Sequence, residues 1–214
     1  MVAISLIALL VFMRVDISEA ESTRLPKTVS PDKTVFLLKE QRTDGGTRIF
    51  FVDAVTGEKL GAVLSLFNEG DLGNVNIISS WNGSSSKVAL LIYYGTRSSK
   101  IKVFKRTNED TFVPVDLLLP DPLAIYGKGD LKTLSEEHVS ASENALGPWN
   151  DNSVRLISGV MVDRGNNEFV HLLVTFTAVI DAKADIKDVK LVGPYSDQEA
   201  DRFLEEWGTK YWEE

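Results

Sequence analysis

The sequence predicts a mainly β protein, an antiparallel meander of hairpins followed by a C-terminal amphipathic helix. Three observations predict it. Short β-rich runs recur along the chain, and turn sequences such as Thr43-Asp44-Gly45-Gly46 separate them. Apolar and polar residues alternate in runs such as 101–105. Near the C-terminus the apolar period becomes that of a helix. We expect an open sheet or a sandwich with propeller-like blades.

Residues 1–20 are expected to be a signal peptide. Residues 2–13 are apolar except for Ser5, and this run is shorter than the roughly 20 residues of a membrane span. Ser18-Glu19-Ala20 has small residues where signal peptidase reads them, so we place cleavage after Ala20. An uncleaved anchor or a buried first strand is the alternative, because no Lys or Arg precedes the apolar run. The mature chain, 21–214, is expected to be one β-rich domain without a membrane span.

The expected strands follow one another in three groups. The run 88–94 is almost continuously apolar, which predicts a central strand buried on both faces. In 101–105, Ile101 and Val103 should lie on one face and Phe104 on the other. An irregular insert, 120–150, is expected to contain a short helix over 130–139 and a polar loop over 140–150. The predicted strands are 34–39, 48–54 and 60–66, then 75–79, 88–94, 101–105 and 112–119, then 154–162, 168–180 and 186–192.

The last predicted element is a helix that begins with a capping box. Ser196 is the expected N-cap, and Glu199 stands three residues later. The apolar residues that follow have helical spacing, which predicts one face packed against the sheet. They are Ala200, Phe203, Leu204, Trp207 and Tyr211.

One pattern occurs in three places: a polar turn that leads into an apolar strand. It occurs at Ser30-Pro31-Asp32-Lys33, Trp81-Asn82-Gly83-Ser84 and Trp149-Asn150-Asp151-Asn152. These segments resemble the repeats of exported β-propellers of the TolB and WD40-like type. The first lacks the glycine of that motif, and the other two keep the Trp without the Pro-Asp pair. Three units are too few for a closed propeller, which typically has about 4–8 blades. The resemblance therefore implies propeller-like hairpins.

Composition and charge exclude several classes of protein. The chain has 23 Lys and Arg, 31 Asp and Glu, and a net charge of -8, which argues against a nucleic-acid-binding surface. The sequence contains no Cys, so disulfides, thiolate metal sites and cysteine nucleophiles are excluded. An exported protein without disulfides is typical of a bacterial envelope. A periplasmic or secreted location is therefore expected.

The sequence contains no motif that identifies a catalytic, metal or cofactor site. The predicted function is an exported, non-catalytic binding or protein-interaction module of the bacterial envelope, with an unknown protein or glycan ligand. Tyr126 and Trp149 flank the insert and are the predicted ligand-binding residues, because binding residues concentrate on long loops. The alternative is an exported hydrolase that uses His171 with nearby carboxylates. A third hypothesis is a calcium-stabilised module that uses Asp163 and Asn166.

Overall fold

The computed structural model describes residues 21–41, 46–66, 75–94, 98–127, 139–165 and 168–207. Within these ranges the protein is mainly β, with three antiparallel four-stranded sheets. Sheet A contains β1 (Glu21–Arg24), β2 (Val35–Gln41), β3 (Thr47–Asp53) and β4 (Lys59–Leu66). Sheet B contains β5 (Val75–Trp81), β6 (Lys87–Tyr94), β7 (Ser98–Arg106) and β8 (Phe112–Val115). Sheet C contains β9 (Val139–Asn150), β10 (Ser153–Asp163), β11 (Phe169–Ile180) and β12 (Ala184–Tyr195).

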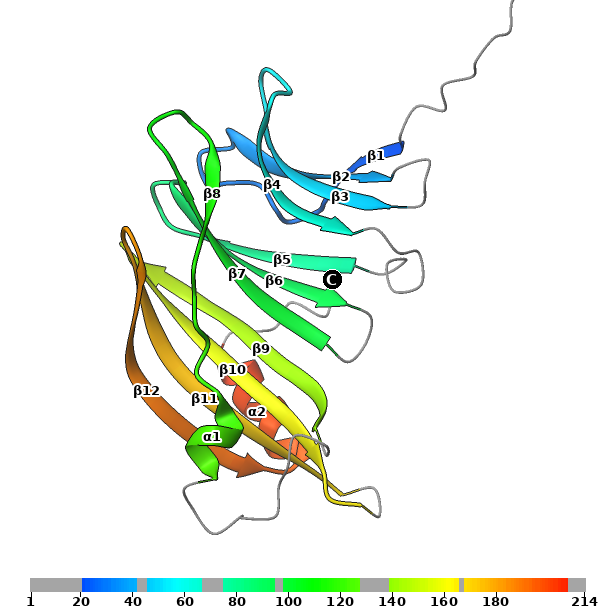
Figure 1. The fold of residues 1–214 in the computed structure, drawn as a ribbon, viewed down its shortest axis with the longest axis vertical. Coiled ribbons are helices and arrows are strands. Elements are labelled where there is room, and N and C mark those ends of the chain that lie inside the picture. The colour runs from blue at the N-terminus through cyan, green and yellow to red at the C-terminus, as the bar shows by residue number, and fades with distance from the viewer. Residues whose placement is uncertain are drawn as a thin grey trace, which may run out of the picture.

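Consecutive strands are neighbours in every sheet, so the predicted antiparallel meander is confirmed. The three sheets follow one another along the length of the molecule, with sheet B in the middle (Figure 1). The described helices are α1 (Pro122–Tyr126) and α2 (Asp197–Glu206), and both pack on sheet C. Neither has the length and apolar character that a membrane-crossing helix requires.

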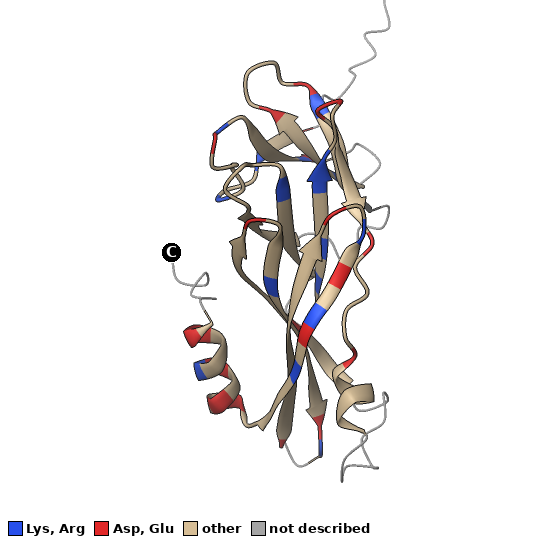
Figure 2. Ribbon diagram, turned by 90° about the vertical axis from the view of Figure 1, so that its left-hand side faces the viewer, with Lys and Arg blue, Asp and Glu red and all other residues tan. Residues whose placement is uncertain are grey.

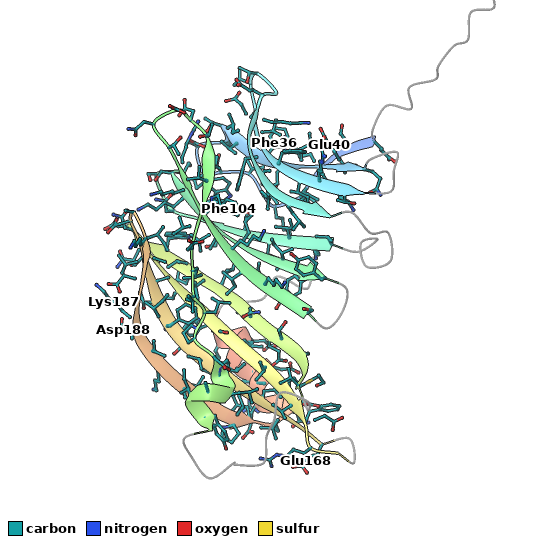
Figure 3. All side chains as sticks on the ribbon, in the orientation of Figure 1. Phe36, Glu40, Phe104, Glu168, Lys187 and Asp188 are labelled. Carbon is teal, nitrogen blue, oxygen red and sulfur yellow. The ribbon has the colours of Figure 1, made fainter. Side chains whose placement is uncertain are left out.

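Sheet B contributes its two faces to two different hydrophobic cores. Strand β6 shows this directly, because Leu90 packs in the core with sheet A and Leu91 packs in the core with sheet C. The prediction that 88–94 is buried on both faces is therefore confirmed. Strand β7 alternates as expected: Phe104, labelled in Figure 3, belongs to the first core, and Val103 belongs to the second.

The three recurring turns all join the first and second strands of a sheet. In sheet A, Ser30 N–H donates to the carbonyl of Val35, and in sheet B Asn82 N–H donates to the carbonyl of Lys87. In sheet C the turn is tighter, since Asn150 pairs with Ser153. Each turn contains one non-glycine residue with a positive φ, a conformation that turns need and that strands disfavour. These residues are Lys33, Ser85 and Asp151.

Two strands, β1 and β9, are absent from the strands predicted from the sequence. Strand β1 is exposed and polar, and it is held by backbone pairing with β2. Strand β9 occupies 139–150, so the expected polar loop over 140–150 is wrong. Its polar side chains contact sheet B: Ser99 N–H donates to Ser142 Oγ at 2.9 Å, and Asn144 Nδ2 donates to the Ser99 carbonyl at 2.9 Å. Hydrogen bonds thus replace the apolar alternation that marks an ordinary strand.

The remainder of the predicted insert is described in part. Helix α1 begins at Asp121, whose carboxylate accepts a hydrogen bond from Leu123 N–H at 2.9 Å, followed by Pro122 in the first turn. The helix predicted over 130–139 lies outside the described residues except for Val139, which begins β9. The predicted signal peptide, 1–20, also lies outside them.

The predicted C-terminal helix is confirmed as α2. Its capping box is present, with the Glu199 carboxylate accepting hydrogen bonds from the Ser196 N–H and hydroxyl, each at 2.9 Å. Phe203, Leu204 and Trp207 pack on the face of sheet C that points away from sheet B. Tyr211, the last residue of the predicted apolar face, lies outside the described residues.

Candidate binding site beside helix α2

The imidazole of His171 lies between two carboxylates that come from distant parts of the chain. Its Nδ1 is 2.6 Å from Glu143 Oε2 on β9, and its Nε2 is 2.8 Å from Asp197 Oδ1 at the start of α2. The imidazole is 6% exposed, whereas the Asp197 side chain is 66% exposed. We call His171, Glu143 and Asp197 the clasp, because they join β11, β9 and α2.

The two carboxylates keep His171 protonated. Burial lowers the pKa of the imidazole, but the hydrogen bonds and negative charges of Glu143 and Asp197 outweigh it and raise the pKa to about 9. As an imidazolium, the ring donates from both nitrogens. No nitrogen is then left to accept a proton from a substrate or to bind a metal. The clasp is therefore a structural ion pair between sheet and helix in this arrangement.

The clasp positions α2 across the outer face of sheet C. His171 pairs with Tyr195 across the sheet, and the chain enters α2 directly after that residue. Beyond the clasp, Tyr195, Phe203 and Trp207 pack around a small buried core that contains Ile157 and Leu173. The helix is thus fixed by charge at its first turn and by apolar contact at its last.

An open groove of about 490 Å³ lies between the last turn of α2 and sheet C. This volume falls within the roughly 300–1,000 Å³ of small-molecule sites. The groove crosses all four strands of the sheet, and α2 forms its other wall. It is lined by Pro148 from β9, Arg155 from β10, Thr175 from β11, Lys190 and Val192 from β12, and Phe203, Glu206 and Trp207.

Two cationic side chains of the groove have no acidic partner among the described residues. Neither Arg155 nor Lys190 forms an ion pair with a carboxylate of the described residues. The Arg155 guanidinium instead lies over the indole of Trp207, 4.1 Å from the ring centroid. A cation–π contact of this kind limits where the guanidinium can move while its N–H donors stay available for hydrogen bonds. The groove therefore combines a preorganised cation, a second cation and an apolar wall.

The close packing of this wall depends on Gly147 in β9. A Cβ at this position would lie 2.9 Å from the Arg155 carbonyl oxygen and 3.3 Å from Trp207 Nε1. Glycine therefore lets the indole approach the backbone of β9, and this approach places the ring beneath Arg155.

The two residues predicted to bind a ligand do not share a site. Trp149 packs between sheets B and C, and its indole N–H donates to the Ser80 carbonyl at 2.8 Å. Tyr126 packs with Val162 near the other end of β10. Trp149 pairs with Val154, and eight residues of strand separate Val154 from Val162, which is roughly 26 Å. Both side chains support the scaffold, and neither lines the groove.

The turn of the calcium hypothesis is described only in part. The carboxylate of Asp163 accepts a hydrogen bond from Gly165 N–H at 2.7 Å, as a turn aspartate does. Asn166 lies outside the described residues. Within the described ranges, no three His, Asp or Glu side chains are grouped as ligands for a metal ion.

Sequence reasoning singled out His171 but missed its partners and the groove. Glu143 and Asp197 are 28 and 26 residues from His171, and β9 was not predicted. Arg155 and Lys190 resemble any exposed cation in the sequence. The clue that was available is the aromatic end of α2, since Trp207 was predicted to face the sheet.

A scan against protein-family models finds no match, and neither the curated proteins nor the solved structures that were searched contain a similar one.

Proposed function

We propose that the protein is an exported, non-catalytic binding module of the bacterial cell envelope and that its ligand occupies the groove beside α2. The observation that supports it best is that Arg155 and Lys190 line an open groove and form no ion pair with any carboxylate that the structure describes. Cations that form no ion pair with a described carboxylate can bind a negatively charged or polar group of a ligand. The apolar residues 2–13 and the absence of Cys support export.

The clasp gives this site a rigid wall. Binding sites are most effective when their walls are fixed before the ligand arrives, because less side-chain and backbone freedom is then lost on binding. Asp197 is held at one end of α2, and Trp207 lines the groove at the other. We therefore assign the clasp a positioning role, in place of the catalytic role that the hydrolase hypothesis gives His171.

Binding is tested by thermal unfolding of the full chain against peptides, glycans and cell-wall fragments. A ligand that binds the native state at about 100 times its Kd adds about 2.7 kcal/mol, a shift of several degrees. The shift should disappear in the double variant Arg155→Ala, Lys190→Ala and should persist in Trp149→Phe. A ligand that stabilises the double variant as strongly as the parent protein would place the site elsewhere.

Export has a separate test. After expression in a Gram-negative host, the mature protein should appear in the periplasmic fraction with Glu21 as its first residue. An unprocessed chain in the cytoplasm would contradict the export part of the proposal and would leave the groove untouched.

A further inference from the structure

We infer that the groove beside α2 binds an extended acidic segment of a protein partner, with one carboxylate on Arg155 and another on Lys190. This inference rests on the proposed function and names the ligand class of that site. Arg155, Lys190 and Glu206 are the charged residues that line the groove, so its lining is net positive in a chain whose net charge is -8. An acidic ligand is therefore attracted locally to this groove.

The shape of the groove fits a peptide that crosses the sheet. Arg155 lies on β10 and Lys190 on β12, with Thr175 of β11 between them and paired with Lys190. Arg155 pairs with Thr177, two residues along β11 from Thr175, so two strand spacings and this offset together separate the backbones of the two cations by about 12 Å. In an extended peptide, alternate side chains point the same way and lie about 6.6 Å apart. Two Glu residues with one residue between them can reach both cations through their flexible side chains.

The chemistry of the lining favours carboxylates over neutral ligands. A guanidinium presents paired N–H donors in its plane, and these match the two oxygens of a carboxylate. Phe203 and Trp207 give the α2 wall of the groove an apolar surface. In an extended peptide the residue between the two acidic positions points the opposite way from them, toward this wall, so it is expected to be apolar. Glu206 lies at the rim next to Trp207 and would repel a third carboxylate there.

The rest of the outer face of sheet C is less suited to such a ligand. Charges of both signs alternate along β12 (Figure 2), and Lys187 pairs with Asp185 at 3.4 Å. Lys187 and Asp188 lie together on this strand, as Figure 3 labels them. Lys187 there already has a carboxylate partner, whereas no carboxylate of the described residues forms an ion pair with Arg155 or Lys190. This contrast restricts the predicted acidic contact to the groove.

The test uses two synthetic peptides and the full chain. The probe is acetyl-Glu-Phe-Glu-Val-amide, and the control is acetyl-Gln-Phe-Gln-Val-amide, which has the same shape without charge. In calorimetric titration at low salt, the Glu peptide should bind at least tenfold more tightly than the Gln peptide. Arg155→Gln and Lys190→Gln should each weaken the Glu peptide about fivefold to tenfold. Lys183→Gln, an exposed cation outside the groove, should leave its affinity unchanged.

Three results would overturn the inference. If the two peptides bind with equal affinity, the carboxylates do not contribute to binding. If Lys183→Gln weakens the Glu peptide as much as Arg155→Gln does, the attraction comes from diffuse charge and not from the groove. Tenfold tighter peptide binding after Glu213→Gln and Glu214→Gln would identify the chain's own acidic end as the occupant in place of a partner. The proposed function can survive such a result: if a neutral glycan binds and depends on Arg155 and Lys190, the groove is still the site and only the acidic ligand class is wrong. The proposed function fails if a ligand stabilises the double variant Arg155→Ala, Lys190→Ala as strongly as the parent protein.

Discussion

Removing the clasp histidine should change how the stability of the protein depends on pH. The perturbation is His171→Asn, which keeps a polar side chain of similar reach and removes the titrating charge. A pKa of about 9 in the folded protein, against 6.5 for an ordinary imidazole, corresponds to roughly 3 kcal/mol at about 1.36 kcal/mol per pH unit. Because the Asp197 side chain is 66% exposed, solvent screens that partner. We therefore expect the proton on His171 to contribute about 2 kcal/mol to the free energy of unfolding.

The direction of the effect follows from the raised pKa. The folded state binds the proton more tightly than the unfolded state, so the stabilisation is fully present below pH 6.5. It is lost as the pH rises through the folded-state pKa of about 9. The groups that face the imidazole are Glu143 from β9 and Asp197 from α2, and Tyr195 lies opposite on β12. The loss therefore reports deprotonation of the imidazole.

Urea unfolding of both proteins, followed by tryptophan fluorescence from pH 6 to about pH 9.5, measures this effect. Other titrating groups contribute equally to both proteins and cancel in the difference. The advantage of the parent protein over His171→Asn should shrink by about 2 kcal/mol across the range. Parallel pH profiles would refute the reasoning, because they would show that the two carboxylates do not hold a proton on His171 in the folded state.

Three further substitutions test the scaffold around the groove. Gly159→Ala should destabilise the protein by about 2 kcal/mol in urea unfolding, because a Cβ there would lie 2.4 Å from Leu173 Cδ2 and 2.6 Å from the Glu143 carbonyl oxygen. Gly83→Ala, with nothing within 4 Å of its Cβ, is the matched control. Lys87→Met should lower the free energy of unfolding by about 1–2 kcal/mol, because Lys87 Nζ donates to Asn152 Oδ1 at 2.6 Å and to the Ile180 carbonyl of sheet C. A melting temperature equal to that of the parent protein would contradict this. Trp149→Phe should cost about 1 kcal/mol of stability by losing the bond to Ser80, while calorimetric titration gives unchanged affinity for the Glu peptide.

The sequence was sufficient to predict the elements whose residues form a strong local pattern of apolar or capping side chains. Continuous apolarity predicted the two-faced burial of β6, and the spacing of Ser196 and Glu199 predicted the start of α2. Both signals depend on neighbouring residues in the chain. Strand β9 has no such signal, because its Ser142 and Asn144 side chains contact sheet B through hydrogen bonds and not through apolar packing. The apolar alternation that would predict a strand is therefore missing.

The candidate site was less predictable because it depends on long-range pairing. Alternation along β11 placed His171 on a face with Leu173 and Thr175 but did not indicate which acidic residues approach it. Glu143 reaches it only because β9 pairs with β10, and Asp197 only because the chain turns into α2 after β12. The groove likewise depends on register shifts in sheet C, between Val154 and Leu156 on β10 and between Thr175 and Thr177 on β11. No local pattern specifies these shifts.

The burial of β6 on both faces has a consequence for its register. A shift of one residue would move Leu90 out of the core with sheet A and Leu91 into it, and both faces would still be apolar. Hydrophobicity alone therefore does not choose between the two alignments. The Asn82 turn does, because its buried Oδ1 accepts hydrogen bonds from Ser86 N–H at 3.0 Å and Lys87 N–H at 2.9 Å and fixes the residue at which β6 begins. The alignment of the most apolar strand in the protein is thus specified by one polar amide at its edge.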